Sequence, residues 1–214
     1  MFYDFVCAAV KIILAAFTRI HIEGLENVPR SGSFLMVSNH LNLIDPPVLG
    51  ALLRRRIAFM AKEELFRTPV VGWVVKGYGA FSVRRGQADR QALRTAVTVL
   101  KQGGAIGIFP EGHRSETGKM IEAHPGAALI ALTSAAPVLP VGIWGTDRVR
   151  SPLSLLLRPR IDIRIGEPFM LQRSASGKED LGQATRTMMA RVARLIPDDR
   201  RGYYADAVDE NLEH

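Results

Sequence analysis

Apolar residues dominate the first 20 positions, and the few polar ones follow a helical period. In "MFYDFVCAAVKIILAAFTRI", Asp4, Lys11 and Thr18 recur every seven residues and Arg19 follows, so a helix over 1–20 would carry one narrow polar stripe. The longest uninterrupted apolar runs are six residues, too short to span a bilayer. Two interpretations remain, a helix packed on a core or an amphipathic helix in a membrane interface. The second is favoured because so wide an apolar face at a chain end needs a large partner surface.

Beyond residue 20, short apolar runs typical of strands alternate with segments that have a helical period. A helix is predicted over 46–56, with two prolines in its first turn and Asp45 as its cap. Further helices are predicted over 88–102, about 126–135, and a segment marked by Leu181, Met188, Val192 and Leu195. The predicted strands are 34–38, 78–83, 105–109, 137–145 and a less buried one at 160–169. This alternation predicts an α/β fold, with a mostly parallel central sheet flanked by helices.

Three polar clusters directly follow predicted strands. Asn39-His40 follows the first strand, Arg84-Arg85 the second, and residues 111–114 (Glu-Gly-His-Arg) the third. If these strands are parallel, the clusters emerge at one edge of the sheet, the carboxyl edge, where open α/β sheets bind their ligands. The convergence of three clusters is better evidence for a site than any one of them.

Composition and charge limit the classes of partner that the protein could bind. The 214 residues are 47% apolar, which predicts a single domain over 1–211, with Leu212-Glu213-His214 set aside as a tag remnant. One cysteine, Cys7, allows no intramolecular disulfide and fits a reducing compartment. The net charge of +7 indicates an anionic partner: anionic lipid, a phosphorylated small molecule or nucleic acid. Nucleic acid ranks last because there is no basic tail and only 7% of residues are aromatic.

His40 and Asp45 are the first candidate catalytic pair. Across a turn that enters a helix, Asp45 can fold back and hold one ring nitrogen of His40, leaving the other nitrogen as a base. The alternative is structural: Asp45 only caps the helix and His40 is an ordinary loop histidine. The pair alone does not decide between them.

The other two clusters offer anion ligands. Arg85 ends a strand at the predicted site, and an arginine can grip a phosphate with two parallel hydrogen bonds. In "FPEGHRS", Glu111 could accept a hydrogen bond from a substrate hydroxyl or hold an arginine, Gly112 permits an unusual turn, and Arg114 could bind phosphate. Against this stand an ordinary Pro-Glu-Gly turn and solvated surface arginines.

These blocks resemble those of the glycerolipid acyltransferases of the 1-acyl-sn-glycerol-3-phosphate acyltransferase type. That family carries four ordered blocks, here "NHLNLID", "GAFSVRR", "FPEGHRS" and "VLPVGI", and the resemblance runs from about residue 20 to 170. Each block alone is weak, but four in order with similar spacing are highly specific.

The resemblance implies acyl transfer from acyl-CoA or acyl carrier protein to a lipid hydroxyl, with no cofactor beyond that co-substrate. His40 would deprotonate the acceptor hydroxyl for direct attack on the thioester, and Asp45 would orient His40. Arg85, Glu111 and Arg114 would hold the glycerol phosphate. Backbone amides near Gly112 or Gly142 would be candidates for stabilising the oxyanion.

One position departs from the family pattern. Where the family often has F-K-x-G, with its lysine aimed at the acceptor phosphate, this chain has "EAHPGAA", which puts His124 in that substrate-binding place. The acceptor, 1-acyl-sn-glycerol-3-phosphate by resemblance, could therefore be another lysophospholipid or a glycolipid. His113, Glu122 and His124 match no metal-ligand spacing, so no metal is expected.

The resemblance and the first 20 residues together predict a peripheral or monotopic protein on the cytoplasmic face of the membrane. Two other functions were weighed. A hydrolase using the His-Asp pair lacks a Gly-x-Ser-x-Gly elbow, and Ser38 is a poor nucleophile candidate. A monotopic lipid-binding protein would have little reason to gather His40, Asp45 and Glu111 at one sheet edge.

Overall fold

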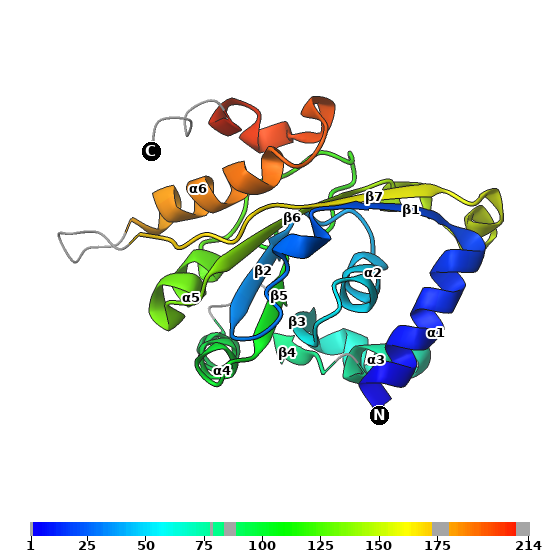
Figure 1. The fold of residues 1–214 in the computed structure, drawn as a ribbon, viewed down its shortest axis with the longest axis horizontal. Coiled ribbons are helices and arrows are strands. Elements are labelled where there is room, and N and C mark those ends of the chain that lie inside the picture. The colour runs from blue at the N-terminus through cyan, green and yellow to red at the C-terminus, as the bar shows by residue number, and fades with distance from the viewer. Residues whose placement is uncertain (1, 78, 84–88, 173–179, 209–214) are drawn as a thin grey trace.

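A mostly parallel sheet forms the centre of the protein (Figure 1). The computed structural model describes residues 2–77, 79–83, 89–172 and 180–208. Within these residues the sheet has seven strands in the order β1-β7-β6-β2-β5-β3-β4, and only the β6–β7 pair is antiparallel. The strands are β1 (Arg19–Glu23), β2 (Phe34–Ser38), β3 (Ile57–Lys62), β4 (Phe81–Val83), β5 (Ala105–Ile108), β6 (Val138–Trp144) and β7 (Arg160–Ile165).

Helices cover both faces of this sheet, and the buried strands alternate between two cores. On β2, Leu35 and Val37 belong to one core, whereas Phe34 and Met36 belong to the other. The first core is closed by α4 (Arg90–Lys101), α5 (Gly126–Ser134) and α6 (Leu181–Ala193). The second is closed by α1 (Phe2–Phe17) and α2 (Asp45–Leu52), with α3 (Pro69–Gly77) packed against α1 (Figure 1). This confirms the predicted α/β class and its largely parallel sheet.

The N-terminal helix α1 has two apolar faces with different surroundings. Val6, Cys7 and Leu14 are buried against the rest of the molecule. Phe5 and Ile12, in contrast, are 63% and 70% exposed. Within the described chain, no helix has both the length and the apolar character needed to cross a membrane. The helix thus packs on the protein core with one face and leaves a second apolar face uncovered.

The predicted elements were correct in the middle of the chain and less so at its start. The helix expected over 1–20 ends at Phe17, because residues 19–23 form the edge strand β1, which pairs with β7. The helix expected over 46–56 ends at Leu52, and Arg54 has the left-handed φ of 54°. β7 is more buried than predicted because it lies between β1 and β6. Three elements, β1, β3 and α3, were not predicted from the sequence.

The topology brings the predicted clusters to one edge. β2 and β5 are adjacent and parallel, so the segments after Ser38 and after Ile108 leave the sheet side by side. β4 also points this way, but lies two strands beyond β5, about 10 Å across the sheet. β7 runs opposite to β6 and parallel to β1, so both β7 and β1 begin at the edge where the other strands end. The end of α1 therefore lies at the carboxyl edge too.

Candidate active site

His40 and Asp45 form a buried pair at the carboxyl edge of the sheet. His40 Nδ1 lies 2.9 Å from Asp45 Oδ2, and the same oxygen accepts hydrogen bonds of 2.7 Å from the backbone amides of Leu41 and Asn42. An oxygen that accepts from two amides is a carboxylate acceptor, so His40 Nδ1 carries the proton that it donates. His40 Nε2 is then left with a free lone pair, as a general base requires.

Asp45 does not cap α2 in the predicted way. The helix begins at Asp45 itself, its N-cap residue is Ile44, and no side chain caps it. The Asp45 carboxylate instead turns back toward the loop that precedes the helix, where it holds His40. Asp45 is completely buried, and its Oδ1 has no hydrogen-bond partner among the described residues. All hydrogen bonds of this carboxylate among the described residues go to the loop of His40, which fits a role in orienting the imidazole.

Three residues that the sequence analysis did not select hold His40 in place. The Asn39 side chain bridges to β6, donating to the Ile143 carbonyl (2.8 Å) and accepting from its amide (2.9 Å). The Phe109 ring stacks on the imidazole with ring centroids 4.3 Å apart. The amide of Ser115 donates to the His40 carbonyl at 2.9 Å. Asn39, Phe109 and Ser115 lie inside the quoted blocks, so their position in the motifs was the signal that could have identified them.

Glu111 lies in the interior rather than at the surface of the site. Its side chain is completely buried, and neither carboxyl oxygen has a well-aligned hydrogen bond within the described part of the chain. Burial, with a smaller contribution from the Asp45 carboxylate, raises the pKa of Glu111 to about 8, although the nearby amides of His40 and Ile121 partly offset this. At neutral pH, Glu111 is therefore mostly protonated beneath the loop of His40.

Replacement of Glu111 by glutamine is expected to change how stability depends on pH. Between pH 4.5 and about 8 the unfolded chain has lost the Glu111 proton while the folded protein keeps it, so the free energy of unfolding falls as pH rises. Glutamine mimics the protonated acid and removes this slope, which is worth on the order of a few kcal/mol. Urea unfolding at pH 5, 7 and 8.5 (roughly the limits of the window) measures it.

The matched control for that measurement is Glu116→Gln, since Glu116 is exposed. We expect Glu116→Gln to follow the wild-type pH dependence and Glu111→Gln to gain stability relative to wild type as pH rises. Parallel curves for wild type and Glu111→Gln would show that Glu111 is ionised in the folded protein at neutral pH.

The structure brings together three of the predicted substrate ligands. Gly112 has the left-handed φ of 74°, and a Cβ there would lie 2.9 Å from the imidazole of His124, whose amide donates to the Pro110 carbonyl at 2.8 Å. Arg114 lies on the same loop, exposed and without an ion-pair partner among the described residues. Arg85, also predicted as a substrate ligand, lies outside the described residues.

Neither candidate oxyanion glycine offers a free amide in an open position. The amide of Gly112 donates to the Phe109 carbonyl at 3.0 Å, within the turn. Gly142 lies in the middle of β6, where a Cβ would lie 2.7 Å from Ile196. Close packing of α6 and its following turn on the sheet thus explains the glycine at 142.

The structure also bears on two other candidate sites, a serine nucleophile and a cluster of metal ligands. Ser38 is completely buried and donates its hydroxyl hydrogen to the Asn39 carbonyl at 3.1 Å, so it is not placed as a nucleophile. In the part of the chain that is described, no three His, Cys, Asp or Glu side chains gather as a metal site would require.

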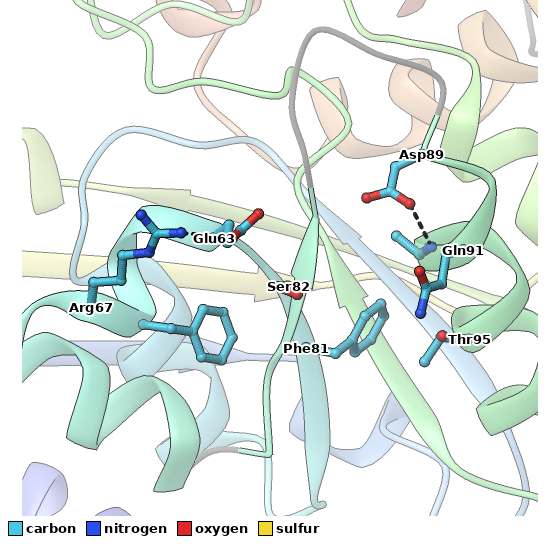
Figure 2. Close-up of a pocket in the computed structure, with 9 residues that line it drawn as sticks. Glu63, Arg67, Phe81, Ser82, Asp89, Gln91 and Thr95 are labelled. Atoms are coloured by element: carbon cyan, nitrogen blue, oxygen red, sulfur yellow. Dashed lines mark hydrogen bonds and ion pairs between the residues drawn. The ribbon is translucent and has the colours of Figure 1, made fainter.

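A cleft of about 610 Å³ opens where β3 and β4 end (Figure 2). It lies between the segment that follows β3, strand β4 and the first turns of α4, and His40 and Asp45 are not among its lining residues. Its lining residues are Glu63, Phe66, Arg67, Phe81, Ser82, Asp89, Gln91, Ala92 and Thr95. Asp89 caps α4 by accepting a hydrogen bond from the Ala92 amide at 3.0 Å.

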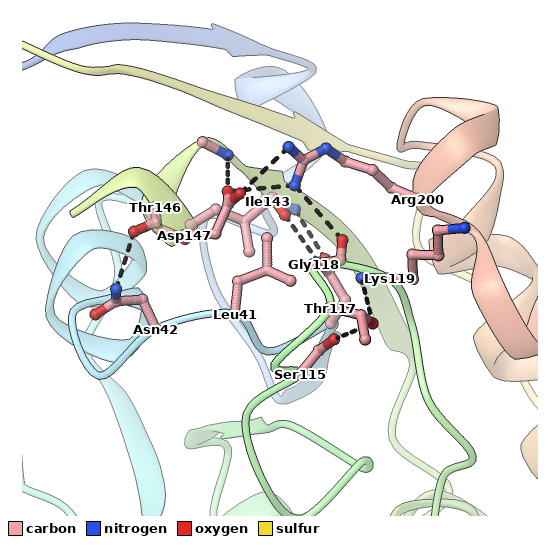
Figure 3. A network of polar contacts seen from close by, with 12 residues as sticks. Leu41, Asn42, Ser115, Thr117, Gly118, Lys119, Ile143, Thr146, Asp147 and Arg200 are labelled. Carbon is pink, nitrogen blue, oxygen red and sulfur yellow. Dashed lines mark hydrogen bonds and ion pairs between the residues drawn. The ribbon is translucent and has the colours of Figure 1, made fainter. Parts of the chain in front are cut away.

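A polar network ties the loop of His40 to the segment that follows β6 (Figure 3). The Asn42 amide donates to the carbonyls of Thr146 and Val149, both at 2.9 Å. Next to it, Arg200 contacts the Asp147 carboxylate at 3.2 and 3.3 Å. These contacts join residues more than 50 positions apart, and those of Asn42 tie the loop of His40 to the segment after β6.

Comparison with known proteins finds similar sequences over most of the chain. The acyltransferase family model matches residues 19–144. The 1-acyl-sn-glycerol-3-phosphate acyltransferase of Bacillus subtilis is 31% identical over 196 residues, covering 90% of this chain and 96% of that protein. The lyso-ornithine lipid O-acyltransferase of Pseudomonas aeruginosa is 32% identical over 156 residues, covering 64% of this chain and 60% of that protein.

A solved structure is similar over most of the chain. The crystal structure of the 1-acyl-sn-glycerophosphate (LPA) acyltransferase PlsC from Thermotoga maritima superimposes with a TM-score of 0.71 at 29% identity, covering 90% of this chain and 79% of that one. Sequence and fold thus agree over the region that carries the His40–Asp45 pair. The chain therefore belongs to the acyltransferase family that contains the 1-acyl-sn-glycerol-3-phosphate acyltransferases, and it is an acyltransferase.

Proposed function

We propose that this enzyme transfers a fatty acyl group from acyl-CoA, or from acyl carrier protein, to 1-acyl-sn-glycerol-3-phosphate. The product is phosphatidic acid, which places the reaction in phospholipid biosynthesis. The observation that carries the proposal is the buried His40 Nδ1–Asp45 Oδ2 contact of 2.9 Å at the carboxyl edge, in a chain of this family. The acyl acceptor is supported by the names of its relatives from Bacillus subtilis and Thermotoga maritima.

The His40–Asp45 pair supplies the proton chemistry of this reaction. His40 Nε2 takes the proton of the acceptor hydroxyl as its oxygen attacks the thioester carbonyl, and the Asp45 carboxylate stabilises the imidazolium that forms. As the C–S bond breaks, the imidazolium returns the proton to the departing thiolate. No acyl-enzyme is needed, which agrees with the buried hydroxyl of Ser38.

The acceptor phosphate is assigned to the exposed side of the same loop. Arg114 and His124 are exposed there, next to the turn at Gly112, and Arg85 belongs to the same proposal on the basis of its motif alone. Glu111 is proposed to support the loop from beneath and not to contact the substrate, because its side chain is completely buried. Its place is to support the loop that carries His40 and Arg114.

The membrane is the proposed source of the acceptor. The uncovered apolar face of α1, with Phe5 and Ile12 more than half exposed, fits a helix lying in the interface on the cytoplasmic side of the membrane. The net charge of +7 favours an anionic surface.

A second acceptor class has a specific observation in its favour. His124 occupies the place where the family pattern often has a lysine, and a neutral imidazole is a weaker phosphate ligand than an ammonium group. The similarity to a lyso-ornithine lipid O-acyltransferase points the same way. Another lysolipid or a glycolipid is therefore the alternative acceptor.

Thiol release from oleoyl-CoA, measured with a panel of lysolipid acceptors, distinguishes these proposals. We expect release that depends on 1-oleoyl-sn-glycerol-3-phosphate and yields phosphatidic acid. Release with another lysolipid alone would replace the proposed acceptor, and release without any acceptor would identify a thioesterase. If oleoyl-CoA supports no release, acylated carrier protein is the donor to test in the same panel.

A further inference from the structure

An exposed leucine cluster protrudes from the connection between β6 and β7. The short helix η4 (Pro152–Leu157) exposes Leu153, Leu156 and Leu157, which are 75%, 68% and 80% accessible. Because η4 is a 3-10 helix with three residues per turn, Leu153 and Leu156 lie on one face and Leu157 lies about a third of a turn away. The helix is closed by a capping box between Ser151 and Ser154, so it is a formed element. Three neighbouring leucines this exposed mark an interaction surface.

The helix η4 lies beside the end of α1, at the carboxyl edge of the sheet (Figure 1). Arg158 donates to the Ala15 carbonyl at 3.3 Å, and Arg19 donates from its side chain to the Arg158 carbonyl and from its amide to the Pro159 carbonyl. The helix η4 therefore adjoins the end of α1, although Ala15 and Arg158 are 143 positions apart in the sequence.

The base of this segment is fixed to the catalytic loop. The Asn42 side chain, three residues before Asp45, donates to the carbonyls of Thr146 and Val149, just before η4 (Figure 3). Whatever η4 binds is thus positioned relative to His40 through a short, hydrogen-bonded path.

The charges around the leucine cluster indicate the kind of partner. Arg148 and Arg150 precede η4 in the chain, Arg158 directly follows it, and Arg19 contacts Arg158. All four are exposed, and none has a carboxylate partner among the described residues. Exposed leucines next to these arginines match a bilayer with anionic head groups. The leucines would enter the acyl region, and the guanidinium groups would contact lipid phosphates. An apolar surface on a protein partner would not require these arginines.

We propose that η4 is a second membrane-insertion element, which with α1 seats the carboxyl edge and its His40 on an anionic bilayer. The inference rests on the proposed membrane association of α1. It adds the acceptor's route: a lysolipid in the bilayer reaches the catalytic edge without crossing bulk water.

The test compares vesicle binding of three matched variants. The η4 variant combines Leu153→Ser, Leu156→Ser and Leu157→Ser, the α1 variant is Ile12→Asp, and the control combines Leu129→Ser with Met170→Ser, two exposed apolar residues elsewhere. Cosedimentation with phosphatidylcholine vesicles, with and without phosphatidylglycerol, measures partitioning. We expect the η4 variant to partition at least roughly tenfold more weakly, and the control to bind like wild type.

Two further measurements are enzymatic activity on embedded and soluble acceptors and the preference for anionic vesicles. The η4 variant is expected to lose activity on a vesicle-embedded acceptor by the same factor, while keeping wild-type activity on a short-chain acceptor that is monomeric in solution. Arg148→Gln with Arg150→Gln is expected to reduce the preference for phosphatidylglycerol vesicles, and salt to reduce binding of the wild type.

The outcomes separate the two proposals. Wild-type partitioning by the η4 variant, with binding lost in Ile12→Asp, would overturn the role of η4 and leave that of α1 standing. No vesicle binding by the wild type would overturn both. Weaker binding of the η4 variant without loss of activity on the embedded acceptor would overturn its role in seating the catalytic edge.

Discussion

Replacement of His40 by alanine is expected to lower kcat/KM for acyl transfer by at least about 10²–10⁴-fold, the usual contribution of a positioned general base. Among the described residues, the imidazole of His40 is the only side chain hydrogen-bonded to Asp45, so no second base could take over the role of His40 beside this carboxylate. Acceptor-dependent thiol release, measured at saturating oleoyl-CoA, records the loss.

His21→Ala is the matched control for His40→Ala. His21 lies on the edge strand β1 with its side chain about half exposed, and takes no part in the site. We expect it to retain wild-type activity. Because His40 stacks on Phe109, circular dichroism and thermal melting must show that His40→Ala is folded. A folded His40→Ala enzyme with wild-type activity would remove His40 from the mechanism.

Replacement of Asp45 by asparagine is expected to be the second most damaging change, lowering kcat by about 10²-fold or more. The amide oxygen can still accept the three hydrogen bonds that converge on Oδ2, but without the charge that stabilises the imidazolium. The amide nitrogen would occupy the place of Oδ1, which has no partner among the described residues, so a buried donor would be left unpaired. That second effect is expected to cost about 1–3 kcal/mol of stability.

The double variant separates catalysis from folding. If Asp45 acts through His40, adding Asp45→Asn to His40→Ala lowers the rate little further, because residues that act as a unit are not additive. We also expect kcat to fall in Asp45→Asn while KM changes little. A further loss in the double variant as large as in the single one would assign Asp45 an independent role. Asp4→Asn, an exposed surface change, serves as the control.

Several features of the molecule could be predicted from sequence because their causes are local. The alternation of strands and helices follows from residue periodicity, and it predicts that the segments after β2 and β5 lie at one edge, as the structure shows. The contact between His40 and Asp45 spans five residues and needs only a turn at the start of α2. Short-range geometry of this kind is encoded in the residues themselves.

Elements with weak local signals were missed or misplaced. β1 is an edge strand of alternating exposed and half-buried residues, so the apolar run before it was extended through residue 20. Asp45 was expected to cap a helix, but it is the first residue of that helix. Its carboxylate accepts hydrogen bonds from the amides of Leu41 and Asn42 in the preceding loop instead.

The tertiary structure decided what the site residues can do. Burial by distant segments makes Glu111 a neutral interior group, although its motif predicted a substrate ligand. Chain reversal through β7 places η4 next to α1, and the Asn42 contacts reach 104 and 107 residues along the chain. The sequence by itself determined the fold class and the contact between His40 and Asp45, because both depend on neighbouring residues. The burial of Glu111, its raised pKa and the exposed apolar surface of α1 and η4 depend on which remote segments pack together, so only the tertiary structure could decide them.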